Sequence, residues 1–237
     1  MPQLVFIHGP GAGACADAYE PQLKYFKGSV APNLPGHLEG ERCKTVAGYT
    51  EWVRGWLWAQ GLRKDLVLVG YTLGASIALQ YGLDYPDEVK GMVIMTVAAR
   101  PKTRAPGAYD MRLRAAKDPK VYEEEWIPFQ RLAMQFVEPG LRERLVERHR
   151  QVGPMSQYHD LMTIDAFDVR DRIATLKPKL LIMRGMNDHG NPPEYEKEIH
   201  EAVSGSQYIK LDGVGHFPLT EFPDKLNPLI EKFVAGL

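Results

Sequence analysis

Short, unbroken apolar runs recur along this sequence and constrain its fold more than any other feature. The clearest of them span residues 4–7, 66–69, 92–95 and 180–183. Apolar runs bounded by glycine or polar residues are typical of strands that are buried on both faces, as in a parallel sheet. Weaker runs occur at 208–211 and, shortest of all, at Val30 and Ala31.

Amphipathic helical patterns lie between these runs. They span residues 50–59, 75–84, 193–203 and 224–234. Strands that alternate with helices indicate βαβ units, in which a mostly parallel sheet carries helices on both faces. We therefore predict an α/β fold.

Residues 101–177 interrupt this alternation. The segment is rich in charged residues and helix formers, and it contains no apolar run of the strand type. Six prolines divide it into three or four expected short helices. We predict a helical lid or cap at 101–177, inserted into a core made of residues 1–100 and 178–237.

Charge and composition exclude several classes of function. Lysine and arginine total 29 against 30 acidic residues, so a net charge of −1 gives no reason to expect nucleic acid or an anionic membrane as a partner. With two cysteines only, a disulfide framework is not expected. No apolar run approaches the ~18 residues of a membrane span, and the first residues do not resemble a signal peptide. We expect a cytoplasmic protein with no membrane span.

A strand-to-helix turn at residues 70–74 carries the strongest chemical signal. The sequence Gly-Tyr-Thr-Leu-Gly follows an apolar run and precedes a helical pattern, which is the G-x-S-x-G nucleophile-elbow pattern with threonine in the serine position. The turn places the Thr72 hydroxyl at a helix N-terminus, where free N–H groups favour developing negative charge. The alternative is a tight turn in which Thr72 is chemically inert.

Two further residues follow later strand runs. Asp188 lies just past the run at 180–183, and His216 follows the run at 208–211 between glycine-rich residues. Parallel strands bring their carboxyl ends to one edge, so Thr72, Asp188 and His216 are expected to meet there. His216 would take the proton of Thr72, and Asp188 would orient the imidazole. Taken singly, Asp188 could be a loop cap and His216 a core histidine.

These motifs together resemble the α/β-hydrolase superfamily, in particular small bacterial esterases and related carbon–carbon bond hydrolases with a helical lid. The resemblance covers most of the chain. It includes segments 8–11, 33–37, 70–74, 165–170 and 180–233. It implies an α/β-hydrolase fold with a catalytic triad of Thr72, Asp188 and His216.

The sequence departs from the family pattern at three places. Family members usually have two strands before the His-Gly loop, whereas this sequence starts at that strand, so we expect about six strands. Thr72 stands where serine is usual. Position 10 commonly supplies an N–H to the oxyanion hole, but Pro10 has none. We therefore assign the oxyanion hole to the N–H groups of Leu73 and Gly11.

Large apolar side chains in segment 101–177 suggest where a substrate would bind. Phe129, Met134, Met155 and Met162 either line an acyl pocket or form the core of the lid itself. No grouping of histidine, cysteine and acidic residues has metal-ligand spacing, and no phosphate-binding glycine loop follows a strand. We expect neither a metal nor another cofactor.

The function predicted from the sequence is hydrolysis of carboxylic esters through an acyl-enzyme on Thr72, slowed by the replacement of serine. One alternative is a carbon–carbon bond hydrolase or lyase on the same scaffold. The other is a ligand-binding protein that kept the pocket and lost turnover. The expected partner is a small-molecule ester or acyl substrate, and a homodimer is the one assembly we consider.

Overall fold

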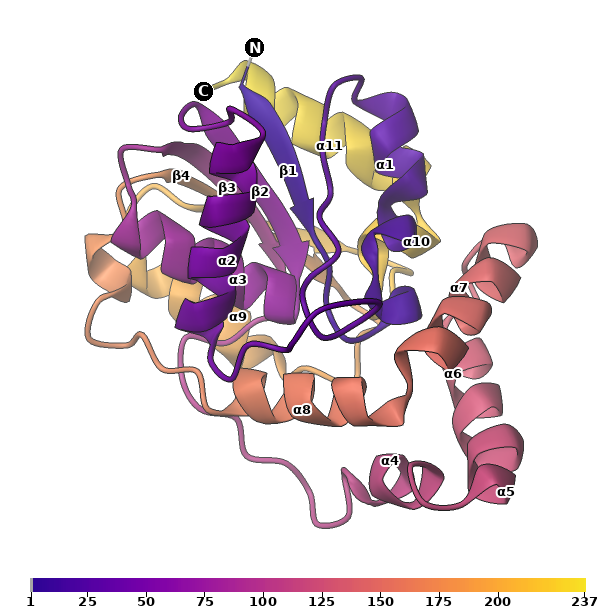
Figure 1. The fold of residues 1–237 in the computed structure, drawn as a ribbon. Coiled ribbons are helices and arrows are strands. Elements are labelled where there is room, and N and C mark those ends of the chain that lie inside the picture. The colour runs from indigo at the N-terminus through magenta and orange to yellow at the C-terminus, as the bar shows by residue number, and fades with distance from the viewer. Residues whose placement is uncertain (1) are drawn as a thin grey trace.

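A five-stranded, fully parallel sheet forms the centre of the molecule. The computed structural model describes residues 2–237. Each strand pairs in parallel with its neighbour in chain order (Figure 1). The strands are β1 (Gln3–Ile7), β2 (Leu66–Tyr71), β3 (Val89–Met95), β4 (Lys179–Gly185) and β5 (Gln207–Leu211). The predicted parallel α/β architecture is confirmed.

The strand count is five, whereas the sequence suggested about six. Val30 makes only an isolated parallel bridge to Val5 at the free edge of β1. Its carbonyl accepts the Phe6 N–H at 2.8 Å, and its own N–H donates to the Leu4 carbonyl at 3.1 Å. Pro32 follows two residues later and has no N–H to extend the ladder, so the pairing ends there.

Helices cover both faces of the sheet, as Figure 1 shows. One face packs against α2 (Val46–Ala59), α3 (Leu73–Asp84) and α9 (Pro193–Ala202). The opposite face packs against α1 (Glu20–Tyr25) and α11 (Pro223–Ala235).

Alternating residues of the central strands build these two layers. In β2, Leu66 and Leu68 join the core on the α2 and α3 side, whereas Val67 and Val69 join the core on the α11 side. All four side chains are fully buried. Burying each one contributes about 1.5–3 kcal/mol, so the apolar runs of the sequence account for both layers.

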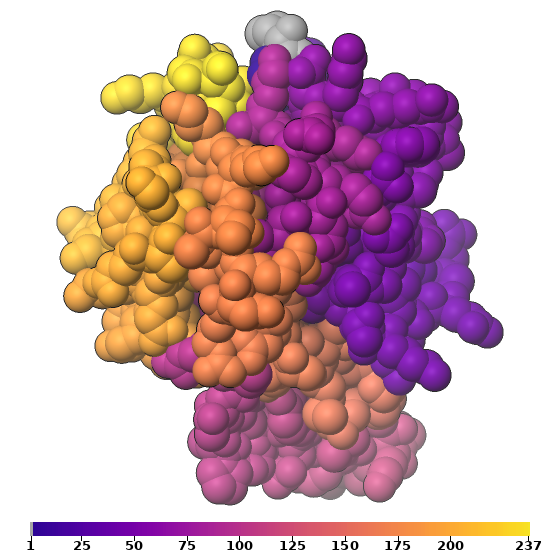
Figure 2. All heavy atoms as spheres, turned by 90° about the vertical axis from the view of Figure 1, so that its left-hand side faces the viewer, coloured from indigo at the N-terminus to yellow at the C-terminus, as the bar shows by residue number. Residues whose placement is uncertain are grey.

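Residues 101–177, which we call the cap segment, contain helices and loops and no strand. In Figure 2 much of this segment forms a lobe below the body of the molecule. Its helices are α4 (Asp110–Ala115), α5 (Pro119–Val121), α6 (Ile127–Ala133), α7 (Pro139–Val152) and α8 (Pro154–Asp165), with a π-helical turn at Tyr122–Trp126. Helices α5 to α8 carry a proline in the first turn, where a missing N–H costs little.

Buried polar contacts attach the cap segment to the loops that follow β1. Asp160 of α8 accepts a hydrogen bond from Nε2 of His37 at 2.8 Å, and both side chains are almost fully buried. Burial opposes the charged form of His37, but the Asp160 carboxylate outweighs it and raises the pKa of the imidazole. On α7, burial lowers the pKa of His149 to about 3, so the ring is neutral and accepts the Gly13 N–H at 2.9 Å.

Candidate active site

Thr72 occupies a strained turn between β2 and α3. Its backbone angles are φ 50° and ψ −116°, a conformation that is unfavourable for a β-branched residue. Two glycines make the turn possible. A Cβ on Gly74 would lie 1.8 Å from the Ile7 carbonyl oxygen, and one on Gly70 would lie 2.5 Å from the Gly74 carbonyl carbon. The glycines of the sequence motif are therefore steric requirements of this turn.

Other strained residues lie at the same edge of the sheet. Ala12 and Ala14 after β1, and Thr96 after β3, have φ of 48°, 52° and 55°. Non-glycine residues rarely adopt such angles, and they tend to collect where a site must hold a fixed geometry. The carboxyl-terminal edge of the sheet is thus a candidate site on backbone grounds alone.

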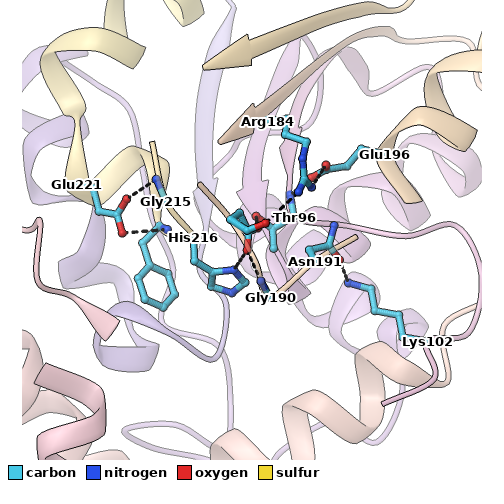
Figure 3. A network of polar contacts seen from close by, with 11 residues as sticks. Thr96, Lys102, Arg184, Gly190, Asn191, Glu196, Gly215, His216 and Glu221 are labelled. Carbon is cyan, nitrogen blue, oxygen red and sulfur yellow. Dashed lines mark hydrogen bonds and ion pairs between the residues drawn. The ribbon is translucent and has the colours of Figure 1, made fainter. Parts of the chain in front are cut away.

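Asp188 and His216 meet at this edge through a direct hydrogen bond. His216 Nδ1 lies 2.8 Å from Asp188 Oδ1. The same Asp188 oxygen accepts the Gly190 N–H at 2.8 Å, and its Oδ2 accepts the Thr96 hydroxyl at 3.3 Å (Figure 3). Burial opposes the charge of Asp188, but the hydrogen bonds from His216 and Gly190 outweigh it and lower the pKa of the carboxyl. Asp188 is therefore an ionised acceptor, so His216 donates to it through Nδ1 and directs Nε2 away from the carboxylate.

A buried ion pair supports Asp188 from behind. Arg184 Nη1 lies 2.6 Å from Glu196 Oε2, and Arg184 Nη2 donates to the Asp188 backbone carbonyl at 3.0 Å. The other Glu196 oxygen accepts the Thr96 N–H at 2.6 Å. Burial raises the pKa of Glu196 despite the contact with Arg184. The sequence interpretation missed these three residues. An arginine within the buried strand β4 was the available signal, because such a charge requires a partner.

The loop that carries His216 is fixed by Glu221, a residue also missed at the sequence level. Glu221 lies in α10 (Pro218–Glu221) and accepts the Gly215 N–H at 3.1 Å and the Phe217 N–H at 3.4 Å (Figure 3). Burial raises the pKa of this carboxyl. Because Glu221 binds the amides on both sides of His216, it determines where the imidazole lies.

The Thr72 hydroxyl makes no hydrogen bond to His216. Thr72 Oγ1 is buried and has no hydrogen-bond partner in the range 2–237. It lies over Gly9, at 1.9 Å from the position that a Cβ on Gly9 would take. Thr72 thus lines the cavity, but the contact expected between its hydroxyl and the imidazole is not formed.

A cavity of about 350 Å³ adjoins these residues. Thr72, Asp188 and His216 all line it, with Phe217 beside the histidine. The side chain of His216 is 36% exposed, whereas that of Asp188 is 2% exposed. The structure thus brings together the three residues expected from the sequence and leaves the imidazole accessible from the cavity.

The residues expected to bind substrate are placed in different environments. Phe129 lines the cavity. Met134 is fully buried in the core of the cap segment, because it ends α6 and packs inward. Met155 and Met162 are exposed on α8. In the part of the chain that the structure describes, none of these three methionines lines this cavity, whereas Met162 lines a neighbouring hollow together with Lys102 and Arg104.

Of the two residues assigned to the oxyanion hole, Gly11 lines the cavity and Leu73 directly follows Thr72, which also lines it. The Leu73 N–H belongs to the first turn of α3, where amides have no acceptor within the helix. Gly11 lines the cavity, and its N–H makes no hydrogen bond in the part of the chain that the structure covers. The Gly11 carbonyl, in contrast, accepts the Ala14 N–H at 3.0 Å and the Tyr71 hydroxyl at 3.1 Å.

Metal ligands, membrane-spanning helices and reactive thiols are the other features of residues 2–237 that bear on function. No group of three histidine, cysteine or acidic side chains is placed to hold a metal ion. No helix in that range is long and apolar enough to cross a bilayer. Burial raises the pKa of the Cys15 thiol to about 12, so it is not a thiolate nucleophile at neutral pH.

Comparison with known proteins extends these observations. The model of the alpha/beta hydrolase family matches residues 4–229. AB hydrolase superfamily protein YisY of Bacillus subtilis is 25% identical over 185 residues, which span 72% of this chain and 66% of that relative. The 2-hydroxy-6-oxo-2,4-heptadienoate hydrolase of Pseudomonas putida is 22% identical over 98% of this chain and 89% of its own length. A thermophilic esterase from Thermogutta terrifontis has the same fold, with a TM-score of 0.80, 22% identity and coverage of 100% of this chain and 90% of that structure.

Proposed function

Because this chain belongs to the alpha/beta hydrolase family, we propose that it hydrolyses carboxylic esters of small molecules through Thr72, His216 and Asp188. The observation that carries the proposal is the 2.8 Å hydrogen bond between His216 and Asp188 in the wall of a cavity that Thr72 also lines. In this proposal the cap segment is a lid over that cavity.

His216 acts as the general base. Its Nδ1 proton is held by Asp188, so the Nε2 lone pair accepts the proton of the Thr72 hydroxyl as Oγ1 attacks the ester carbonyl. The tetrahedral intermediate expels the alcohol, which takes the proton back from Nε2. Water then attacks the acyl-threonine in the same way and releases the acid, and the proton returns to Thr72.

The N–H groups of Leu73 and Gly11 are the proposed donors to the oxyanion. Gly11 lines the cavity and Leu73 follows Thr72, which also lines it, and neither amide donates to another acceptor among residues 2–237. Donors placed about 2.7–3.1 Å from the oxyanion are what such a site requires. Pro10 cannot take part, because it has no N–H.

Attack also requires a hydrogen bond between Thr72 and His216 that is not formed in the structure. The hydroxyl oxygen lies over Gly9 and has no partner among residues 2–237, so Oγ1 must come within reach of Nε2 of His216. The methyl on Cβ restricts χ1 and hinders this adjustment. This restriction is the reason to expect slow turnover.

A panel of chromogenic esters of short and long acids tests the proposal. The chain should hydrolyse at least one of them, and His216→Ala should remove that activity, because a neutral hydroxyl without a base is a poor nucleophile. His200→Ala is the matched control. His200 lies on α9, bonds to Ser206 and does not line the cavity, so this variant should keep full activity. Activity of His216→Ala within about tenfold of wild type would contradict the proposed base.

Two observations favour other functions of the same site. Similarity to the Pseudomonas putida enzyme, whose named substrate contains no ester, favours hydrolysis of a carbon–carbon bond. The missing hydrogen bond between the Thr72 hydroxyl and His216 favours a protein that binds ligands without turnover. Failure to hydrolyse any ester, together with cleavage of a vinylogous 1,5-diketone, would replace ester hydrolysis by the first alternative. Failure with both substrate classes would favour the second.

A further inference from the structure

The cavity beside His216 is lined by more positive than negative charge. Lys102, Arg104 and Arg112 face it from the cap segment. Across the described residues that line it, Asp188 is the single carboxylate, and it is already bonded to His216. This local excess contrasts with the net charge of −1 of the whole chain.

Arg104 has its own counter-ion. Its Nε lies 2.5 Å from Asp165 Oδ2 and its Nη2 lies 2.9 Å from Asp165 Oδ1, which is a bidentate pair. Lys102 and Arg112 make no salt bridge within residues 2–237, and their partners are neutral groups. Within residues 2–237 neither of these two cations thus has a carboxylate at salt-bridge distance, although the charges of Asp165, Glu196 and Asp188 also act on Lys102.

Several hydrogen-bond donors around these cations are also unused. Lys102 Nζ donates to Asn191 Oδ1 at 2.6 Å (Figure 3). The Asn191 amide nitrogen is buried and has no acceptor in the described structure. Arg112 donates through Nε to Gln157 Oε1 at 2.7 Å and through Nη1 to the Ala108 carbonyl at 3.0 Å. Its Nη2 makes no hydrogen bond to any residue that the structure describes. Donors that remain unpaired in a cavity wall are unfavourable until a ligand satisfies them.

The cations also affect one another. Burial lowers the pKa of Lys102 to about 8, and the charge of Arg104 is the next cause. Burial and then Arg104 likewise lower the pKa of Arg112 to about 10. The charge of Arg104 therefore disfavours the charged forms of Lys102 and Arg112. An anion bound in the cavity would favour those charged forms and raise both pKa values again.

We propose that the cavity binds a substrate that carries a carboxylate in addition to its scissile bond, and that Lys102, Asn191 and Arg112 bind this carboxylate. The inference rests on the proposed function for the reaction at the scissile bond. A carboxylate presents two acceptors in one plane, which matches the guanidinium of Arg112 and the amide of Asn191. A cavity of about 350 Å³ suits a small acid ester better than a long acyl chain.

Calorimetric binding to the full chain at neutral pH tests this proposal without any turnover. The probes are succinate, glutarate and adipate, each compared with its neutral diamide, and inorganic phosphate serves as the other anion. At least one dicarboxylate should bind about tenfold or more tightly than its diamide, because a charge-assisted hydrogen bond is stronger than a neutral one. Phosphate should bind more weakly than that dicarboxylate.

Variants locate the binding to these side chains. Arg112→Gln and Lys102→Met should each raise the Kd of the dicarboxylate by about tenfold or more, whereas Lys102→Arg keeps the charge and should retain most of the affinity. Arg114→Gln is the matched control, because Arg114 lies on the same helix α4 as Arg112, is exposed, and pairs with Glu125 outside the cavity. Circular dichroism and the unfolding midpoint verify that each variant is folded.

The proposal is overturned if every diamide binds as tightly as its acid, or if phosphate binds more tightly than all three dicarboxylates. It is also overturned if Arg112→Gln leaves the Kd unchanged, or if Arg114→Gln weakens binding equally. Should Lys102→Met not fold, Arg112→Gln and Lys102→Arg decide the outcome. A chain that hydrolyses no ester can still meet these criteria, and an active esterase can fail them, so the two proposals are tested separately.

Discussion

Replacing Thr72 by serine should increase hydrolysis. In the structure the threonine hydroxyl lies over Gly9, is buried and has no hydrogen-bond partner in residues 2–237. To act as the nucleophile this hydroxyl must form a hydrogen bond to His216, in a turn whose backbone is already strained, with φ 50° and ψ −116°. Serine retains the hydroxyl and lacks the methyl that restricts χ1.

The size of the gain follows from the methyl. Threonine fills two of the three staggered positions on Cβ with heavy atoms, whereas serine fills one, so serine can adjust χ1 in this turn with less crowding. A χ1 held away from its staggered position costs about 0.5–1.5 kcal/mol. Since 1.36 kcal/mol corresponds to tenfold in rate, this cost explains a factor of about 2 to 13. Misplacement of the attacking oxygen by about 1 Å can add up to ~10²-fold. We therefore expect Thr72→Ser to raise kcat/KM by about 10- to 100-fold.

The assay compares kcat/KM of wild type, Thr72→Ser and Thr72→Ala on one activated ester. Thr72→Ala should be inactive. The matched control is Thr50→Ser in α2, which removes a buried methyl from the core at a cost of about 1 kcal/mol in stability and should leave kcat/KM unchanged. Equal activity in wild type and both Thr72 variants would remove Thr72 from the mechanism. A wild type well above Thr72→Ser would show that the surrounding loops suit threonine and would refute the steric reasoning.

Two further predictions concern the cap attachment and the oxyanion loop. Asp160→Asn should lower the free energy of unfolding by about 3 kcal/mol, because it leaves buried His37 without its counter-ion. The pKa of His37 is raised in the folded state, so this loss should be complete below about pH 6.5 and shrink as pH rises through the raised value, which urea unfolding at about pH 6 and pH 9 measures. Gly11→Ala places a Cβ 2.1 Å from the Phe217 ring and should lower kcat/KM about tenfold or more by displacing the loop that carries His216, the proposed base. Gly55→Ala, with open space around it, is its control, and equal activity in the two variants would contradict the prediction.

Much of the fold was predictable because the apolar runs encode it directly. Strands β2, β3 and β4 are fully buried along most of their length, so each one appears in the sequence as an unbroken apolar run. The expected strand count of about six was too high by one. The two-residue run at Val30 and Ala31, beside Pro32, forms a single bridge and no ladder. Local apolarity therefore predicts central strands well and edge strands poorly.

The site was predictable only in part. Asp188 and His216 could be located because each follows a strand at the edge where parallel strands end. Which side of α6 or α8 faces the cavity depends on how the cap segment packs, and no local pattern contains that information. Met134 thus proved to be core, and Met162 proved to be exposed. The rotamer of Thr72 likewise depends on Gly9, which lies far away in the sequence.

The buried ion pair behind Asp188 helps to decide whether this chain is an enzyme or a binding protein. The pair of Arg184 and Glu196 is almost fully buried, with side chains 5% and 1% exposed. A buried ion pair is seldom more stabilising than apolar residues of the same volume, so stability alone does not explain it. Both members of the pair help to hold Asp188 in place. Arg184 donates to the Asp188 backbone carbonyl. Glu196 accepts the Thr96 N–H, and the Thr96 hydroxyl donates to the Asp188 carboxylate. A protein that only bound ligands would have little need to fix a carboxylate that is already bonded to its histidine. The ion pair therefore favours a role in which the orientation of His216 matters, as it does for a general base.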